Sequence, residues 1–99
     1  MTSQIPQLRL YSRSYCHLCD DLLHALEALR EELNALHASH ALHADFSIEV
    51  VDVDSNPQWV ERYDELVPVL VRLVATEDAG ERELCHYFFD REAVIQGLK

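Results

Sequence analysis

Cysteines, basic residues and long apolar runs are scarce in this sequence, and each shortage excludes a class of protein. Three cysteines in 99 residues, with no apolar export signal before Arg9, argue against a secreted domain held by structural disulfides. No apolar run approaches the roughly 18 residues that a membrane-spanning helix needs. Eight basic side chains against 18 acidic ones give a formal net charge of −10, which disfavours nucleic acid and anionic membranes as partners. We therefore expect a monomeric cytoplasmic protein with one domain over residues 1–99.

The most informative feature is a pair of cysteines, Cys16 and Cys19, between a short apolar run and a long helical pattern. Residues three apart face the same way on a helical turn, so the two sulfurs can close a small disulfide ring. Cys16 would lie at the helix N-terminus, where unpaired N–H groups and the positive end of the helix dipole stabilise a thiolate. The thiolate is the nucleophile of disulfide exchange, so the spacing indicates a reaction class but no substrate.

The apolar pattern predicts elements in the order β-α-β-α-β-β-α. Strands are expected at Leu8–Tyr11, Phe46–Val53, Val69–Val74 and Glu83–Tyr87, and helices at Cys19–Ala38, Pro57–Tyr63 and Arg91–Gln96. Asn56 and Asp90 are the expected N-caps of the last two helices, and Gly97 is expected just past the end of the last one. A right-handed parallel β-α-β unit extended by an antiparallel hairpin gives an α/β fold. Its mixed four-stranded sheet would carry helices on both faces.

This order, with C-x-x-C between the first strand and the first helix, resembles the thioredoxin fold. The string from Tyr11 to Cys19 is similar to a glutaredoxin active site, with Arg13 in the position of the basic residue before the cysteine pair. Val67-Pro68, directly before a strand, matches the place of the cis-proline that faces the cysteines in this fold. The C-H-L-C pair and the string Val67 to Leu70 are similar to those of small bacterial glutaredoxin-like proteins. The chain is therefore interpreted as a single glutaredoxin-like domain.

Cys16 and Cys19 are the candidate catalytic residues, and Arg13 and His17 beside them belong to the candidate substrate-binding residues. Cys16 is the expected nucleophile, and Cys19, one turn into the helix, is the expected resolving thiol. Arg13 would add positive potential that lowers the pKa of Cys16. His17, when protonated, would also favour the thiolate and make the pair more oxidising. A solvated His17 without a role is an equally simple interpretation.

The candidate substrate-binding residues come from three segments. Tyr15 could line a docking surface, and the resemblance implies that the Val67 backbone, before a cis Pro68, pairs with an extended substrate. Glutaredoxins that use glutathione usually carry a Gly-Gly and an aspartate before the last helix. Asp90 matches that aspartate here, whereas Phe88-Phe89 precedes it and no glycine pair is present. We therefore expect a protein disulfide or small thiol as substrate, glutathione as a candidate co-substrate, and no tightly bound cofactor.

Other residues that resemble functional motifs have simpler explanations. Cys85 lies in an expected strand and fits a buried small side chain. His37, His40 and His43 are spaced like metal ligands, but no cysteine or carboxylate completes the set, so a solvated helix end is favoured. Asp52-x-Asp54-x-Asn56 imitates the start of a calcium loop, but Pro57 replaces the glycine that such a loop requires. We expect no metal site at these residues.

Three functions stay open at this point. The first is a thiol-disulfide oxidoreductase that uses Cys16 and Cys19 in a dithiol mechanism. The alternative is a non-catalytic binding module of the same fold, with Tyr15, Phe88 and Phe89 as the partner surface. A weaker alternative is metal or iron–sulfur binding through the C-x-x-C pair, although the absence of a second such pair argues against zinc.

Overall fold

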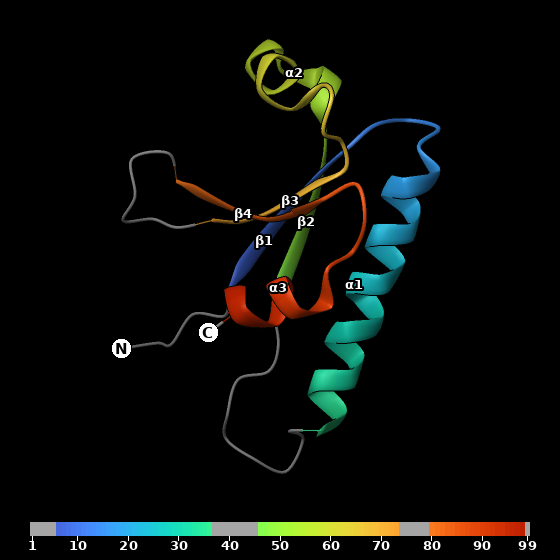
Figure 1. Cartoon of the computed structure of the whole chain (residues 1–99), viewed down its shortest axis with the longest axis vertical. Coiled ribbons are helices and arrows are strands. Elements are labelled where there is room, and N and C mark those ends of the chain that lie inside the picture. Colours follow the sequence, from blue (N-terminus) through green and yellow to red (C-terminus); the bar gives the residue numbers. More distant parts are fainter. Residues whose placement is uncertain (1–5, 37–45, 74–79, 99) are drawn as a thin grey trace.

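The computed structural model of the chain describes residues 6–36, 46–73 and 80–98. Its elements are β1 (Gln7–Ser12), α1 (His17–Leu36), β2 (Ser47–Asp52), the 3-10 helix η1 (Val53–Ser55), α2 (Pro57–Tyr63), β3 (Val69–Leu73), β4 (Glu81–His86) and α3 (Arg91–Gly97) (Figure 1). The predicted α/β class and element order are confirmed. Parts of the prediction lie outside the described residues, namely His37, His40, His43, the end of the first helix, Val74 and most of the hairpin turn.

The four strands form one mixed sheet in the order β2-β1-β3-β4. β1 runs parallel to β2 and antiparallel to β3, and β4 is antiparallel to β3. In the register, Tyr11 at the end of β1 faces Val69 at the start of β3, and Val69 faces His86 at the end of β4. The segments that follow β1, precede β3 and follow β4 therefore meet at one edge of the sheet. That edge carries the site described below, and the fold is thioredoxin-like.

One face of the sheet is covered by α1 and α3. The predicted apolar stripe of α1 supplies Leu22, Leu26 and Leu29, all at most 2% exposed. They pack against residues from the strands, from the start of β2 and from α3, namely Leu8, Leu10, Phe46, Leu70, Cys85 and Val94. Burying a leucine side chain contributes about 1.5–3 kcal/mol. The stripe therefore fixes α1, and the N-terminus of α1, against the sheet.

The opposite face is covered by α2, so the predicted placement of helices on both faces is confirmed. Asn56 begins α2 as predicted, because its side chain accepts a hydrogen bond from the N–H of Gln58. The ring centroid of Tyr63 lies 4.5 Å from that of Tyr11 on β1, and the ring centroid of Trp59 lies 5.4 Å from that of Tyr11. Aromatic packing thus attaches this short helix to the sheet.

A part-buried carboxylate, that of Glu81, joins this aromatic group to two arginines. Its side chain is only 11% exposed and accepts hydrogen bonds from the hydroxyls of Tyr11 and Tyr63. Arg9 and Arg62 lie 3.4 and 3.5 Å from its oxygens. Burial, helped by the bond to Glu81, raises the pKa of Tyr63 to about 12. We call these five residues the Glu81 network.

The predicted boundaries of β1 and β2 differ from the observed ones by one residue at each end, and those of α1, β4 and α3 differ for identifiable physical reasons. α1 begins at His17, two residues before the predicted start, because Cys16 rather than a later residue caps it. β4 begins at Glu81 and ends at His86, since Tyr87 has a φ of 64° and leaves the strand. Gly97 is the last residue of α3 rather than a residue past its end. It is buried, and a Cβ there would collide with the side chain of Leu84, so glycine permits the close approach of α3 to β4.

Candidate functional site

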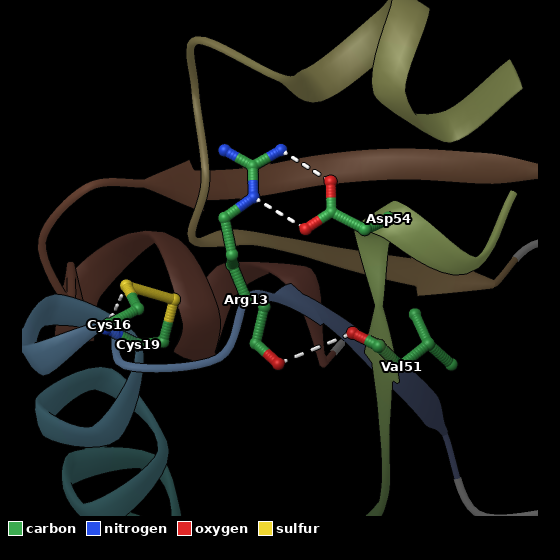
Figure 2. The surroundings of a disulfide bond; sticks show 6 residues. Arg13, Cys16, Cys19, Val51 and Asp54 are labelled. Carbon is green, nitrogen blue, oxygen red and sulfur yellow. Dashed lines mark hydrogen bonds and ion pairs between the residues drawn. A yellow bond between two sulfur atoms is a disulfide. The ribbon is translucent and has the colours of Figure 1, made fainter. Parts of the chain in front are cut away.

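The cysteine pair lies where β1 passes into α1. Cys16 and Cys19 are joined by a disulfide, with their Cα atoms 5.2 Å apart (Figure 2). The carbonyl of Cys16 accepts the N–H of Asp20 at 3.2 Å, which is the first hydrogen bond of the helical pattern. Cys16 is thus the N-cap residue, and Cys19 belongs to the first turn. The predicted position of the pair at the start of the helix is confirmed.

The two sulfurs have unequal environments. Cys19 is 3% exposed, whereas Cys16 is half-buried. The Sγ of Cys16 also accepts the backbone N–H of Cys19 at 3.1 Å. A helix start offers such N–H groups without partners inside the helix, and they stabilise a negative charge on the sulfur. Cys16 is therefore the more accessible of the two sulfur-bearing residues.

Arg13 is held by two carboxylates. Its guanidinium donates to both oxygens of Asp54, at 2.9 and 3.0 Å, and to Asp64 at 2.6 Å. These bonds, with Asp54 first, raise the pKa of Arg13. Figure 2 shows the side chain extending from the β1–α1 loop toward Asp54 rather than toward the disulfide. The loop before Cys16 is thereby tied to η1 and to the residue after α2, and the predicted effect of Arg13 on Cys16 stays a prediction.

Exposed side chains border the disulfide on its solvent side. Tyr15 is fully exposed and has a φ of 60°, a conformation that is uncommon for a residue with a Cβ. His17 is exposed at the first position of α1, and Leu18 is 38% exposed. These exposed residues are the close sequence neighbours of Cys16. The structure therefore agrees with an accessible first sulfur.

The predicted cis-proline position lies at the same edge of the sheet. The Val67–Pro68 peptide bond is cis, and Val69 after it pairs with Tyr11, near the end of β1. The N–H of Val67 donates to the carbonyl of Tyr63 at 3.1 Å. This donor is therefore already engaged within the chain, and the backbone pairing predicted for a substrate would use the carbonyl of Val67.

The turn between β4 and α3 completes the surroundings of the site. The N–H of Tyr87 donates to the carbonyl of Pro68 at 2.9 Å, and its hydroxyl donates to the carbonyl of Glu65 at 2.6 Å. Tyr87 is 38% exposed and Phe88 is 68% exposed. Tyr87 was not among the predicted site residues, because a strand-like sequence carries no signal for a residue at positive φ. The turn therefore presents two aromatic side chains beside the proline.

Asp90 caps α3, as predicted. Its Oδ1 accepts the N–H of Ala93 at 3.1 Å, and the residue is exposed. The side chain is therefore already used by the helix, while its predicted contact with glutathione stays a prediction.

An open depression of about 670 Å³ lies beside Asp90. It is lined by residues from the end of β4, the following turn and the start of α3, namely Glu83, Leu84, Cys85, His86, Phe88, Phe89, Asp90, Arg91 and Glu92. Cys85 is 8% exposed, as predicted for a buried side chain, and burial raises the pKa of its thiol. A protonated thiol is a poor nucleophile. Both the burial of Cys85 and the raised pKa of its thiol argue against a third reactive thiol.

The described part of the chain offers neither a metal site nor a membrane-spanning helix. Within residues 6–36, 46–73 and 80–98, no group of three histidine, cysteine or acidic side chains is arranged to hold a metal ion. No helix in these ranges is both long and apolar enough to span a membrane. The disulfide and its surroundings are the site that the described residues support.

Comparisons with known proteins agree with this picture. The profile of the glutaredoxin-like domain (DUF836) matches residues 7–99. The structure is similar to the solution NMR structure of protein Ne2328 from Nitrosomonas europaea, with 27% identity, a TM-score of 0.73, and coverage of 100% of this chain and 98% of that chain. A malarial protein shares 12% identity with a TM-score of 0.58, over 97% of this chain and 100% of that chain, which concerns the fold alone. A comparison with curated proteins found no match.

Proposed function

The chain belongs to the glutaredoxin-like domain family, and from that membership we propose that it is a dithiol thiol-disulfide oxidoreductase. The observation that carries the proposal is the inequality of the two sulfurs. Cys16 is half-buried and accepts an N–H at the start of α1, while Cys19 is buried and joined to Cys16. A nucleophile and a resolving thiol require this arrangement.

The reaction begins with both cysteines reduced. The Cys16 thiolate attacks one sulfur of a substrate disulfide, so that a Cys16–substrate disulfide forms and the other substrate sulfur leaves as a thiolate and takes up a proton. Cys19 then loses its proton and attacks the Sγ of Cys16. The second substrate thiolate leaves, and the Cys16–Cys19 disulfide remains. Two electrons pass from the protein to the substrate in each cycle.

An external thiol closes the cycle by the reverse exchange. Glutathione is a candidate for this donor, and a reducing cytoplasm would maintain it. No tightly bound cofactor enters the proposal, because the exchange uses sulfur atoms alone. A disulfide-containing protein or a small disulfide acts as substrate for a monomeric protein.

Trapping of the intermediate tests the proposal. Cys19→Ser should accumulate a covalent Cys16–substrate adduct that mass spectrometry detects, because the resolving thiol is missing. Cys16→Ser should form no adduct and reduce no disulfide. Cys85→Ser is the matched control and should react like the unaltered protein. Disulfide reduction at the full rate by the Cys16→Ser variant would contradict the proposal.

A non-catalytic binding module is the second candidate function. The exposed rings of Tyr15 and Phe88 support it, since large apolar side chains in solvent commonly mark a contact surface. Alkylation separates the two functions. A reactive Cys16 should be labelled below pH 7 in the reduced protein, and an inert Cys16 should not.

A further inference from the structure

We propose that the substrate is a disulfide in an extended polypeptide whose flanking residues are apolar and positively charged. The proposal rests on the proposed disulfide exchange at Cys16 and concerns only what is recognised there. Its basis is the chemistry of three segments that meet at one edge of the sheet: residues 13–21, 64–68 and 87–90. We call this region the site edge.

The segments meet because of the strand register. Tyr11 near the end of β1 faces Val69 at the start of β3, and Val69 faces His86 at the end of β4. Segments 64–68 and 87–90 directly adjoin Val69 and His86, and segment 13–21 begins two residues after Tyr11. Both figures show the β4–α3 turn passing beside the N-terminus of α1. A ligand that reaches Cys16 therefore meets all three segments.

The site edge gathers most of the exposed apolar side chains in the described residues. Among the described residues, five large apolar side chains are exposed. Four of them lie at the site edge: Tyr15, Leu18, Tyr87 and Phe88. The fifth, Val50, lies on β2. Tyr15 and Phe88 are 104% and 68% exposed, so both can still bury apolar surface. A small hydrophilic disulfide would leave these rings in water, whereas a polypeptide with apolar side chains would cover them.

The site edge is also negatively charged. Its exposed carboxylates are those of Asp20, Asp21, Asp64, Glu65 and Asp90, and its one arginine is Arg13. Arg13 is already bound to Asp54 and Asp64. The local field therefore attracts cations and repels anions, in the same sense as the net charge of −10 of the whole chain.

Glutathione disulfide suits this edge poorly, because each half of it carries two carboxylates and one ammonium group. The guanidinium of Arg13 already donates hydrogen bonds to Asp54 and Asp64, at 2.6 to 3.0 Å. The N–H of Val67 is bonded to Tyr63. A lysine- or arginine-bearing polypeptide can pair with Glu65 or Asp20 without breaking either arrangement. Charge complementarity therefore favours the cationic polypeptide.

Kinetics with matched substrates test the proposal. The reduced protein is mixed with two synthetic peptide disulfides that share apolar residues and differ only in lysine or glutamate at the flanking positions. Oxidised glutathione and 2-hydroxyethyl disulfide are the small substrates. We expect the lysine peptide to react about tenfold faster than the glutamate peptide and than oxidised glutathione at low ionic strength. The preference should shrink to about twofold in 1 M salt, where the Debye length is about 3 Å.

Charge variants locate the preference. Asp20→Asn with Glu65→Gln removes two carboxylates from the site edge and should lower the lysine-to-glutamate rate ratio about threefold or more. Glu27→Gln with Glu31→Gln removes two exposed carboxylates farther along α1 and should leave the ratio unchanged. Phe88→Ser should slow both peptides, since the apolar contact is lost.

The outcomes separate this proposal from the proposed function. Equal rates for the two peptides and oxidised glutathione would overturn the polypeptide preference and leave disulfide exchange intact. An equal change of the ratio in both double variants would overturn the site edge as its source. If the protein reduces none of these substrates, not even 2-hydroxyethyl disulfide, the proposed function itself is overturned.

Discussion

The Glu81 network and the site edge use the same sheet in opposite ways. In the network, one carboxylate at 11% exposure is shared by two tyrosines and two arginines. At the site edge, aromatic rings and carboxylates face solvent, and the sulfur of Cys16 stays half-buried. β1 contributes to both, with Tyr11 in the network and the following loop at the edge. Polar groups that satisfy one another stabilise a fold, while groups left facing solvent are available to a ligand.

The comparison predicts that stability and activity can be altered separately. Changes in the network should lower the free energy of unfolding without altering disulfide exchange. Changes at the cysteine pair should do the reverse. The predictions below follow this division, from the largest effect to the smallest.

Loss of Cys16 should have the largest effect on activity. Cys16→Ser should reduce the rate of disulfide reduction by at least about a thousandfold, because a hydroxyl cannot replace the attacking thiolate. The measurement is the rate constant for reduction of a small disulfide by stopped flow. Tyr63→Phe is the control from the Glu81 network. A comparable fall of the rate constant in that variant would show that the network also affects disulfide exchange.

Loss of Glu81 should have the largest effect on stability. Glu81→Ala leaves two phenols and two guanidinium groups without their shared acceptor, which should cost about 2–4 kcal/mol of unfolding free energy. Urea denaturation of the reduced protein measures this difference. The rate constant for disulfide reduction by the folded variant should be unchanged. An unfolding free energy equal to that of the unaltered protein, or a lowered rate constant, would contradict the assignment of Glu81 to the fold.

The Tyr63 hydroxyl should make stability depend on alkaline pH. Since burial raises the pKa of Tyr63 to about 12, from an ordinary value of about 10, the folded state holds this proton more tightly than the unfolded state does. The contribution is therefore fully present below pH 10 and is lost as pH rises to about 12, with a magnitude of roughly 1–3 kcal/mol. Comparison of unfolding free energies at pH 9 and pH 11.5 measures it.

The matched variant for this prediction is Tyr63→Phe. It removes the titrating hydroxyl and keeps the ring against Tyr11, so the loss of stability over this pH range should be smaller than in the unaltered protein. An identical pH dependence in both proteins would show that Tyr63 titrates normally.

The cap of α3 should give the smallest effect. Asp90→Ala removes the acceptor for the N–H of Ala93 and should lower stability by about 1 kcal/mol. Asp90→Asn keeps an acceptor oxygen and should restore most of that loss. Thermal unfolding of the three proteins checks the order. If Asp90→Ala is as stable against thermal unfolding as the unaltered protein, a structural role for the cap is excluded.

The sequence predicts the features that depend on neighbouring residues. The leucine spacing of α1, the caps Asn56 and Asp90, and the place of the cysteines at a helix start all follow from local patterns. It did not predict that Arg13 binds Asp54 and Asp64, which are 41 and 51 residues away. It also did not predict that the Glu81 side chain is only 11% exposed, because a carboxylate next to a turn is ordinarily solvated. Such contacts arise only when the folded sheet brings distant segments together.

The central claim is that Cys16 and Cys19 exchange two electrons reversibly. The most direct test equilibrates the Cys85→Ser variant in glutathione buffers of known potential and quantifies the Cys16–Cys19 disulfide by alkylation and mass spectrometry. We expect one two-electron transition between about −120 and −270 mV, the range of thiol oxidoreductases. A pair that never oxidises, or that stays oxidised under strong reductant, would contradict it.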